Sequence, residues 1–159
     1  MKKVLIILAA LLILGFVAAN IYANRFLNDD QELTAHTASS GGYQYSFVFP
    51  DNAISGNDAT YITGGNGGLA ATAHLVTTAS SCQQQGGTIA FSVTPIGASA
   101  PVTVCHGPLI SKGKTYQAYN IEIVGPQGTK HELIVYGADA DKQLDKVKQI
   151  LSSFAVSQK

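Results

Sequence analysis

Apolar and polar residues alternate along much of the chain, and this alternation indicates β-strands with one buried face. The pattern is clearest at residues 43–49, YQYSFVF, where aromatic residues occupy every second position. Pro50 and Asp51 end this segment. Further strands are predicted at 59–64, 69–78, 88–96 and 101–105, which are rich in β-branched residues and are separated by Gly, Ser and Pro.

A β-hairpin is predicted at residues 115–136, TYQAYNIEIV-GPQG-TKHELIVY, where two alternating segments flank a turn of Gly and Pro. Its expected buried face consists of Tyr119, Ile121 and Ile123 on the first strand and Leu133 and Val135 on the second. Because this face is strongly apolar, we expect the hairpin to lie at the centre of the sheet.

Near the C-terminus the apolar period changes from two to that of a helix, at residues 139–154. Leu144, Val147, Ile150, Leu151 and Phe154 form a single stripe there. Asp139 and Asp141 stand at the start, where carboxylates can cap free amide groups. The predicted fold class is therefore α+β, an antiparallel sheet with a C-terminal amphipathic helix packed on it.

The N-terminus has the order of an export signal. Lys2 and Lys3 precede an apolar run from Val4 to Ala19. Small residues permit cleavage after Ala19, whereas residues 4–23 are long enough to span a bilayer. We therefore expect residues 1–23 to form a signal peptide or a transmembrane signal anchor, with the rest of the chain extracytoplasmic, either membrane-anchored or secreted.

Residues 24–42 contain few apolar groups and end in Ser-Ser-Gly-Gly, a composition typical of a flexible linker. The folded domain is predicted at residues 43–156. The whole chain has 10 lysines and arginines and 10 aspartates and glutamates, so it has no excess positive charge that would attract nucleic acid. A surface rich in Thr, Ser, Gly and Gln suits an unknown protein partner or a neutral ligand.

Cys82 and Cys105 are the only cysteines of the chain. In an exported protein the default prediction is a disulfide between them. The alternative is a thiolate of Cys105 activated by its neighbour His106. Adjacent side chains on a strand point to opposite faces, so His106 is poorly placed to take that proton.

The four histidines lack the spacing of metal ligands. His36, in the predicted linker, and His131, beside the hairpin turn, are expected to be solvated. His74, in an apolar strand, is expected to be a hydrogen-bonded sheet residue. A site formed by His74, His106 and a carboxylate in the folded protein stays open as an alternative.

Two further segments match motifs of enzymes or of cofactor-binding proteins. GNGGLA, residues 65–70, fits a dinucleotide-binding pattern, but a Thr-rich strand follows it and no acidic residue occurs from 59 to 121, so a glycine loop is predicted. SKGK, residues 111–114, matches the nucleophile motif of penicillin-recognising enzymes but is predicted to be a turn. The sequence thus predicts no catalytic, cofactor-binding or metal-binding residues and no cofactor.

YQYSFVFP at residues 43–50 and the segment from 133 to 154 together resemble the small exported PsbP-like domains of bacteria. The resemblance implies an antiparallel sheet with packed helices and a binding or assembly-helping role outside the membrane. The hypothesis is therefore an exported, non-enzymatic binding or accessory module. The alternative is a small extracytoplasmic enzyme that depends on a thiol or a histidine.

Overall fold

The computed structural model describes residues 32–56, 58–63, 68–77, 82 and 86–159. The described residues belong to one unit that runs from Glu32 to Lys159. The predicted signal segment, residues 1–23, and the first half of the predicted glycine loop, residues 65–67, lie outside them. No helix within these described ranges is long and apolar enough to cross a membrane.

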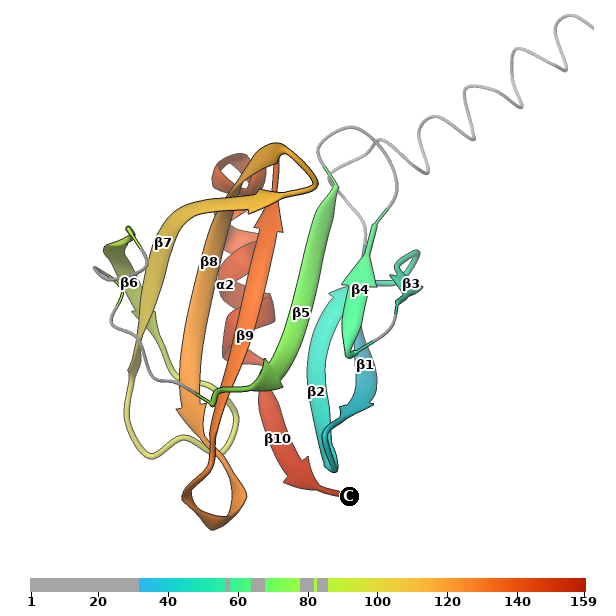
Figure 1. Ribbon diagram of the computed structural model, residues 1–159, viewed down its shortest axis with the longest axis vertical. Helices are drawn as coiled ribbons and strands as arrows, with labels where there is room; N and C mark the ends of the chain where they lie inside the picture. Colours follow the sequence, from blue (N-terminus) through green and yellow to red (C-terminus); the bar gives the residue numbers. More distant parts are fainter. Residues whose placement is uncertain (1–31, 57, 64–67, 78–81, 83–85) are drawn as a thin grey trace, which may run out of the picture. The chain divides into compact units, whose positions relative to one another are not determined.

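The larger of the two sheets in the unit is antiparallel and seven-stranded (Figure 1). In spatial order its strands are β3 (Ile54–Ser55), β4 (Thr60–Ile62), β5 (Leu69–Leu75), β9 (Lys130–Gly137), β8 (Lys114–Val124), β7 (Val102–Ser111) and β6 (Thr88–Val93). The β8–β9 hairpin lies at the centre of this order, as the sequence predicts. The turn between these two strands is the short 3₁₀ segment η1 (Pro126–Gly128).

A second, three-stranded sheet consists of β1 (Leu33–Ser40), β2 (Tyr43–Pro50) and β10 (Ala155–Gln158). β1 lies inside the predicted flexible linker, so that prediction is wrong for residues 33–40. Gly41 and Gly42 both have positive φ angles, +59° and +85°, and they connect β1 to β2. A two-residue turn of this kind joins antiparallel strands, so Ser-Ser-Gly-Gly is the end of a hairpin and the folded unit begins earlier than predicted.

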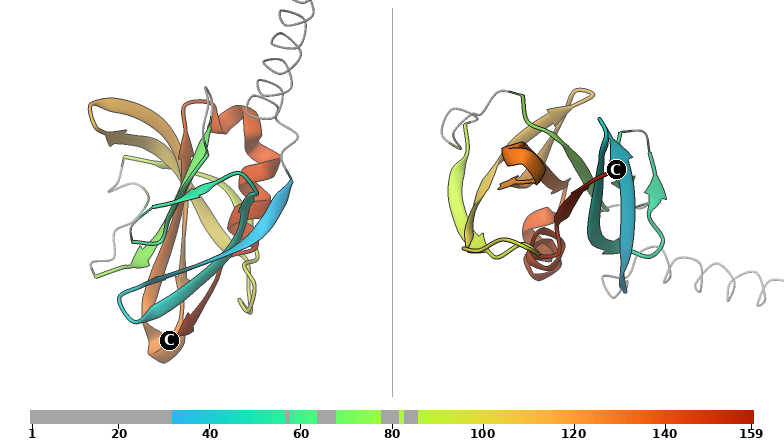
Figure 2. Two further views of the ribbon diagram at one scale, coloured as in Figure 1. Left: turned by 90° about the vertical axis from the view of Figure 1, so that its right-hand side faces the viewer. Right: turned by 90° about the horizontal axis from the view of Figure 1, so that it is seen from below.

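A 3₁₀ turn η2 (Ala140–Gln143) leads into the helix α2 (Leu144–Ser152), which has nine residues. Val147, Ile150 and Leu151 are buried on the helix face that packs against the sheets. α2 lies on one side of the seven-stranded sheet, next to the three-stranded sheet (Figure 2). Neither Asp139 nor Asp141 caps the helix, because Asp139 binds Lys142 and Asp141 accepts a hydrogen bond from Tyr119.

The fold class predicted from the sequence, α+β, is wrong. Among the described residues there are ten strands and a single α-helix of nine residues, so the unit is mostly β-sheet. The helical pattern at 139–154 predicted a helix of 16 residues, which is too long. Its first turn is 3₁₀, and its last residues lead into β10.

The core lies between the two sheets and α2. Aromatic residues of β2 form one wall, with Tyr45, Phe47 and Phe49 almost completely buried. Tyr45 stacks on Phe154 with ring centroids 6.2 Å apart, and Phe47 meets Tyr61 edge to face at 5.5 Å. The opposite wall is the predicted apolar face of the central hairpin: Tyr119, Ile121, Ile123, Leu133 and Val135.

Because side chains alternate along a strand, the central hairpin has a second face that points away from this core. We call it the outer face, and it includes Ala118 and Asn120 on β8 and Glu132 and Ile134 on β9. β5, β9, β8 and β7 present it to the viewer of Figure 1, with α2 behind them. No described helix or strand covers the outer face.

Candidate functional site

A groove of about 250 Å³ lies on the outer face, and we call it the outer groove. It is lined by Gly87, Cys105, Gly107, Pro108, Leu109, Ala118, Asn120, Glu132 and Ile134. Gly107 and Ala118 are cross-strand partners on β7 and β8, and their small size leaves the surface hollow between larger neighbours. The groove is therefore built mainly on paired strands, which hold its lining residues in fixed positions.

The disulfide between Cys82 and Cys105 borders this groove. Cys105 is the cross-strand partner of Asn120, so its side chain lies on the outer face. Gly87 passes so close that a side chain there would place its Cβ 2.7 Å from Cys105 Sγ. Only glycine permits this approach, so the backbone at Gly87 lies directly against the disulfide at the edge of the groove.

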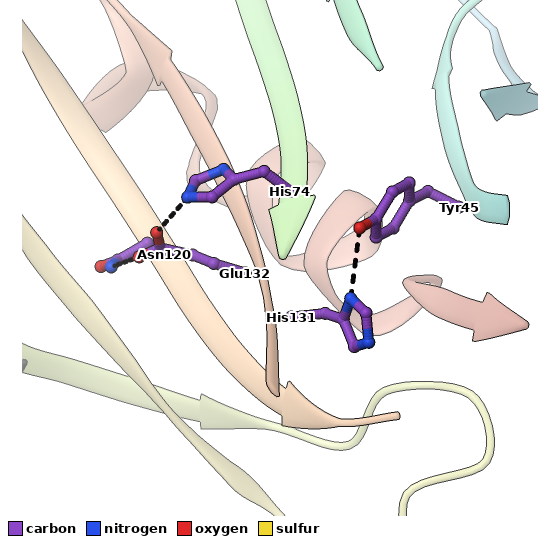
Figure 3. Close-up of polar contacts among 5 residues, drawn as sticks. All are labelled: Tyr45, His74, Asn120, His131 and Glu132. Atoms are coloured by element: carbon purple, nitrogen blue, oxygen red, sulfur yellow. Dashed lines mark hydrogen bonds and ion pairs between the residues drawn. The ribbon is translucent and has the colours of Figure 1, made fainter. Parts of the chain in front are cut away.

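Glu132 is the charged residue of the outer groove, and it has two polar partners (Figure 3). His74 Nε2 lies 3.2 Å from Glu132 Oε2, and Asn120 Nδ2 donates a hydrogen bond to Glu132 Oε1. The three residues come from the adjacent strands β5, β9 and β8: His74 is the register partner of Glu132, and Asn120 lies diagonally across from it, two positions from its β8 partner Glu122. The side chain of Glu132 is only 12% exposed, whereas that of His74 is 43% exposed.

These contacts shift both pKa values. Burial opposes ionisation of Glu132, but hydrogen bonds from His74 and Asn120 outweigh it, so the pKa of Glu132 lies below its ordinary value. The hydrogen bond to Glu132 raises the pKa of His74 above 6.5, against the opposing effect of burial. Glu132 is therefore a carboxylate at neutral pH, and it favours the protonated form of His74.

A second carboxylate stands directly across from the first. Glu122 on β8 is the register partner of Glu132 on β9. Lys130 Nζ lies 2.6 Å from Glu122 Oε1, so Glu122 has a cation of its own. Like charges at opposed positions repel. The Lys130–Glu122 and His74–Glu132 pairs reduce this repulsion on the outer face.

His131, expected to be solvated, is completely buried, so that prediction is wrong. It lies on the core side of β9, where Tyr45 Oη donates to His131 Nδ1 at 3.2 Å (Figure 3). On the other side of the ring, His131 Nε2 lies 2.8 Å from Thr129 Oγ1, which donates to the Pro126 carbonyl. Burial lowers the pKa of His131 below 6.5. His131 is therefore a neutral core residue that stabilises the hairpin turn through its contact with Thr129.

His106 points to the core side of β7, away from Cys105. It stacks on Tyr119 with ring centroids 4.5 Å apart, and its Nε2 lies 3.3 Å from Asp141 Oδ1. Because His74 lies on the outer face, the two histidines do not meet in one site, and the alternative of a joint His74–His106 site is wrong. The separation of His106 from Cys105 follows from strand alternation.

His36, also expected to be solvated, is half-buried on β1. Its ring lies 4.8 Å from that of Tyr61, and its Nε2 lies 3.2 Å from the carbonyl oxygen of Phe49. Among the described residues no group of three or more His, Cys, Asp or Glu side chains could hold a metal ion. The described histidines therefore act separately, each with local partners.

A larger groove, of about 460 Å³, lies between residues 96–102 and the end of the central hairpin. We call it the loop groove, and it is lined by the segment Ile96–Val102 and by Glu122, Ile123, Val124, Gly125, Pro126 and Val156. Its one charged lining residue, Glu122, is already paired with Lys130. The outer groove is smaller, but it combines small and apolar walls with the largely buried carboxylate of Glu132, which suits ligand recognition better.

Comparison with known proteins identifies no family. No protein-family model matches the sequence, and no curated protein is significantly similar to it. Among solved structures, LpqN, involved in cell envelope biogenesis of Mycobacterium tuberculosis, is similar over 85% of this chain and 96% of that chain, with 12% sequence identity and a TM-score of 0.46. This similarity is too low to support an inference about fold or function.

Sequence reasoning did not select the outer groove. It placed His74 in a sheet with a hydrogen-bonding role, but it did not single out Asn120 or Glu132. The available signal was the set of polar residues Asn120, Glu122 and Glu132 at outward positions of the central hairpin, next to a histidine-containing strand. Strand alternation predicts that such residues share a face, but only the register shows that Glu132 pairs with His74.

Proposed function

We propose that this chain is an exported, non-enzymatic binding module that takes a small ligand in the outer groove. The observation that carries the proposal is the largely buried carboxylate of Glu132 beside an apolar groove, on a sheet face that no described element covers. Concave sites with apolar walls and a few fixed polar groups are typical of small-molecule binding.

Export is supported by two independent features. The N-terminal residues 1–23 have the charge and apolar order of a signal peptide or signal anchor. The disulfide between Cys82 and Cys105 suits an oxidising compartment. The module is thus either held at the membrane by its N-terminal segment or released from it, and an accessory role of this kind agrees with the resemblance to PsbP-like domains.

A binding role is favoured over catalysis by the surroundings of the cysteines and of His74 and His106. Both cysteines are in the disulfide, and neither His74 nor His106 hydrogen-bonds a serine, threonine or cysteine among the described residues. Nucleophilic catalysis requires such a contact between the base and the nucleophile. The His74–Glu132 pair is better suited to holding a ligand than to activating a nucleophile.

The proposal is tested by filling the groove. Ala118→Phe places a large side chain on the groove floor, and binding of hexan-1-ol, followed by saturation transfer from the protein to the alcohol in NMR, should weaken by about tenfold or more, or about 1.4 kcal/mol. The matched control is Ala35→Phe on β1, an exposed alanine outside the groove, which should leave binding unchanged. Equal binding to the wild type and to Ala118→Phe would contradict the proposal.

A further inference from the structure

The outer groove carries a local charge that the neutral chain as a whole does not have. Near the groove, four neighbouring residues on the outward side of β5, β9 and β8 have ionisable side chains: Glu132, Glu122, Lys130 and His74. With His74 neutral, two carboxylates and one ammonium group leave one negative charge on this part of the outer face. In a partly desolvated groove such a charge attracts cations more strongly than it does in open water.

Glu132 has acceptor capacity left for a ligand. One carboxylate oxygen contacts His74 and the other accepts a hydrogen bond from Asn120. An ionised carboxylate offers about four lone-pair positions, so two of these partners leave room for further donors. Because Glu132 lines the groove, a donor in the groove reaches it directly.

From this geometry we propose that the outer groove recognises small organic cations, with a primary ammonium group on Glu132 and an attached apolar chain over Ala118 and Ile134. This inference rests on the proposed function of the groove and names the chemical class of its ligand. Ammonium-to-carboxylate hydrogen bonds are charge-assisted and are the stronger class of such contacts. The neutral ligand expected from overall composition is replaced here by a cation, because the local charge differs from the total.

The size of the groove limits the ligand. A volume of about 250 Å³ corresponds to roughly eight water molecules of about 30 Å³ each. A ligand of about that many non-hydrogen atoms fits, which is the size of hexylammonium. Leu109 and Ile134 supply apolar contact for its alkyl chain.

His74 competes with the ligand for the carboxylate of Glu132. When His74 is protonated, its own positive charge pairs with Glu132; when it is neutral, Glu132 is left to pair with the ammonium group of the ligand. The other charged groups on strands around His74 are Glu122 on β8, Lys130 on β9 and Asp58 in the turn before β4. Ammonium binding should therefore strengthen as the pH rises past the titration of His74.

The test compares three probes of equal length: hexylammonium, hexan-1-ol and hexanoate. The titrations are run at about pH 6 and at about pH 8.5, where a larger fraction of His74 is neutral and the alkylammonium stays charged. In NMR titrations of the full chain we expect hexylammonium to bind at least about tenfold more tightly than hexan-1-ol, and hexanoate to bind most weakly. Glu132→Gln should remove the preference for ammonium, so that hexylammonium and hexan-1-ol bind to this variant with similar affinity.

Two variants serve as controls. Asp145→Asn removes one negative charge from the exposed surface of α2, where the side chain is 96% exposed, and should leave the preference intact. His74→Gln removes the competitor, so hexylammonium should bind as well at about pH 6 as at about pH 8.5. If Glu132→Gln does not fold, His74→Gln still tests the inference, because a pH dependence that survives in it contradicts the role of His74.

The outcomes separate the inference from the proposed function. If hexan-1-ol binds and hexylammonium binds no better, the ligand class is wrong and the binding groove stands. If the ammonium preference persists in Glu132→Gln, the cation lies elsewhere and the inference is overturned. If none of the three probes binds, the proposed function fails together with it.

Discussion

His74 and His131 show how strongly the face of a strand determines the chemistry of a side chain. They lie near each other on β5 and β9, yet His74 on the outer face has an acidic partner and His131 on the core face has a phenol and a hydroxyl. An ionised partner favours the imidazolium, whereas burial among neutral groups favours the imidazole. The pKa values of two histidines in one sheet are thereby shifted in opposite directions.

This difference gives a prediction at the scale of single residues. In NMR pH titrations, the imidazole of His74 should titrate above pH 6.5 and that of His131 below it. Glu132→Gln should lower the titration midpoint of His74, because it removes the ionised partner, and should leave His131 nearly unchanged. The account of both sites would be contradicted if the two histidines titrated at the same pH.

The same shifts affect stability, with opposite signs. Below pH 6.5 the unfolded chain protonates His131 more readily than the folded protein does, so this residue destabilises the fold as the pH falls. The raised pKa of His74 stabilises the fold below pH 6.5, and this contribution is lost as the pH rises through its folded value. The variant His74→Gln should therefore lose stability more steeply on acidification than the wild type.

At the scale of elements, alternation in the sequence predicted the aromatic strand and the central hairpin well, because their apolar faces point into one core. β1 was missed, since LTAHTASS has little apolar pattern and forms a strand through its pairing with β2. The helix was overestimated, because a 3.6-residue stripe does not distinguish 3₁₀ from α-helical turns at its ends. Burial of His131 depends on Tyr45, which is 86 residues away in sequence, and no local pattern reveals such a contact.

The disulfide offers a prediction about these elements. It joins β7 to the segment before β6 across 23 positions of sequence. Replacing both cysteines by serine, Cys82→Ser with Cys105→Ser, should lower the free energy of unfolding by roughly 3 kcal/mol, because the unfolded chain regains the freedom of the open loop. Urea unfolding measures this, and the reduced wild type should match the variant. An unchanged midpoint in both would show that the cross-link contributes no stability.

At the scale of the whole unit, the helix and the small sheet cover one side of the seven-stranded sheet and leave the other side open (Figure 2). This asymmetry separates the two groups of polar residues. Those on the covered side, around His131 and His106, have partners within the fold and support structure. Glu132, which is paired with His74 on the open side, lines the outer groove, so a ligand in the groove can reach it.

The most direct test of this account is to map where a ligand binds. Backbone amide shifts of the ¹⁵N-labelled chain during titration with hexylammonium distinguish the two grooves, since their lining residues differ. The account predicts that the largest shifts occur at Gly107, Ala118 and Ile134, which line the outer groove. Shifts confined to Gly97, Ala98 and Val124, which line the loop groove, would contradict it.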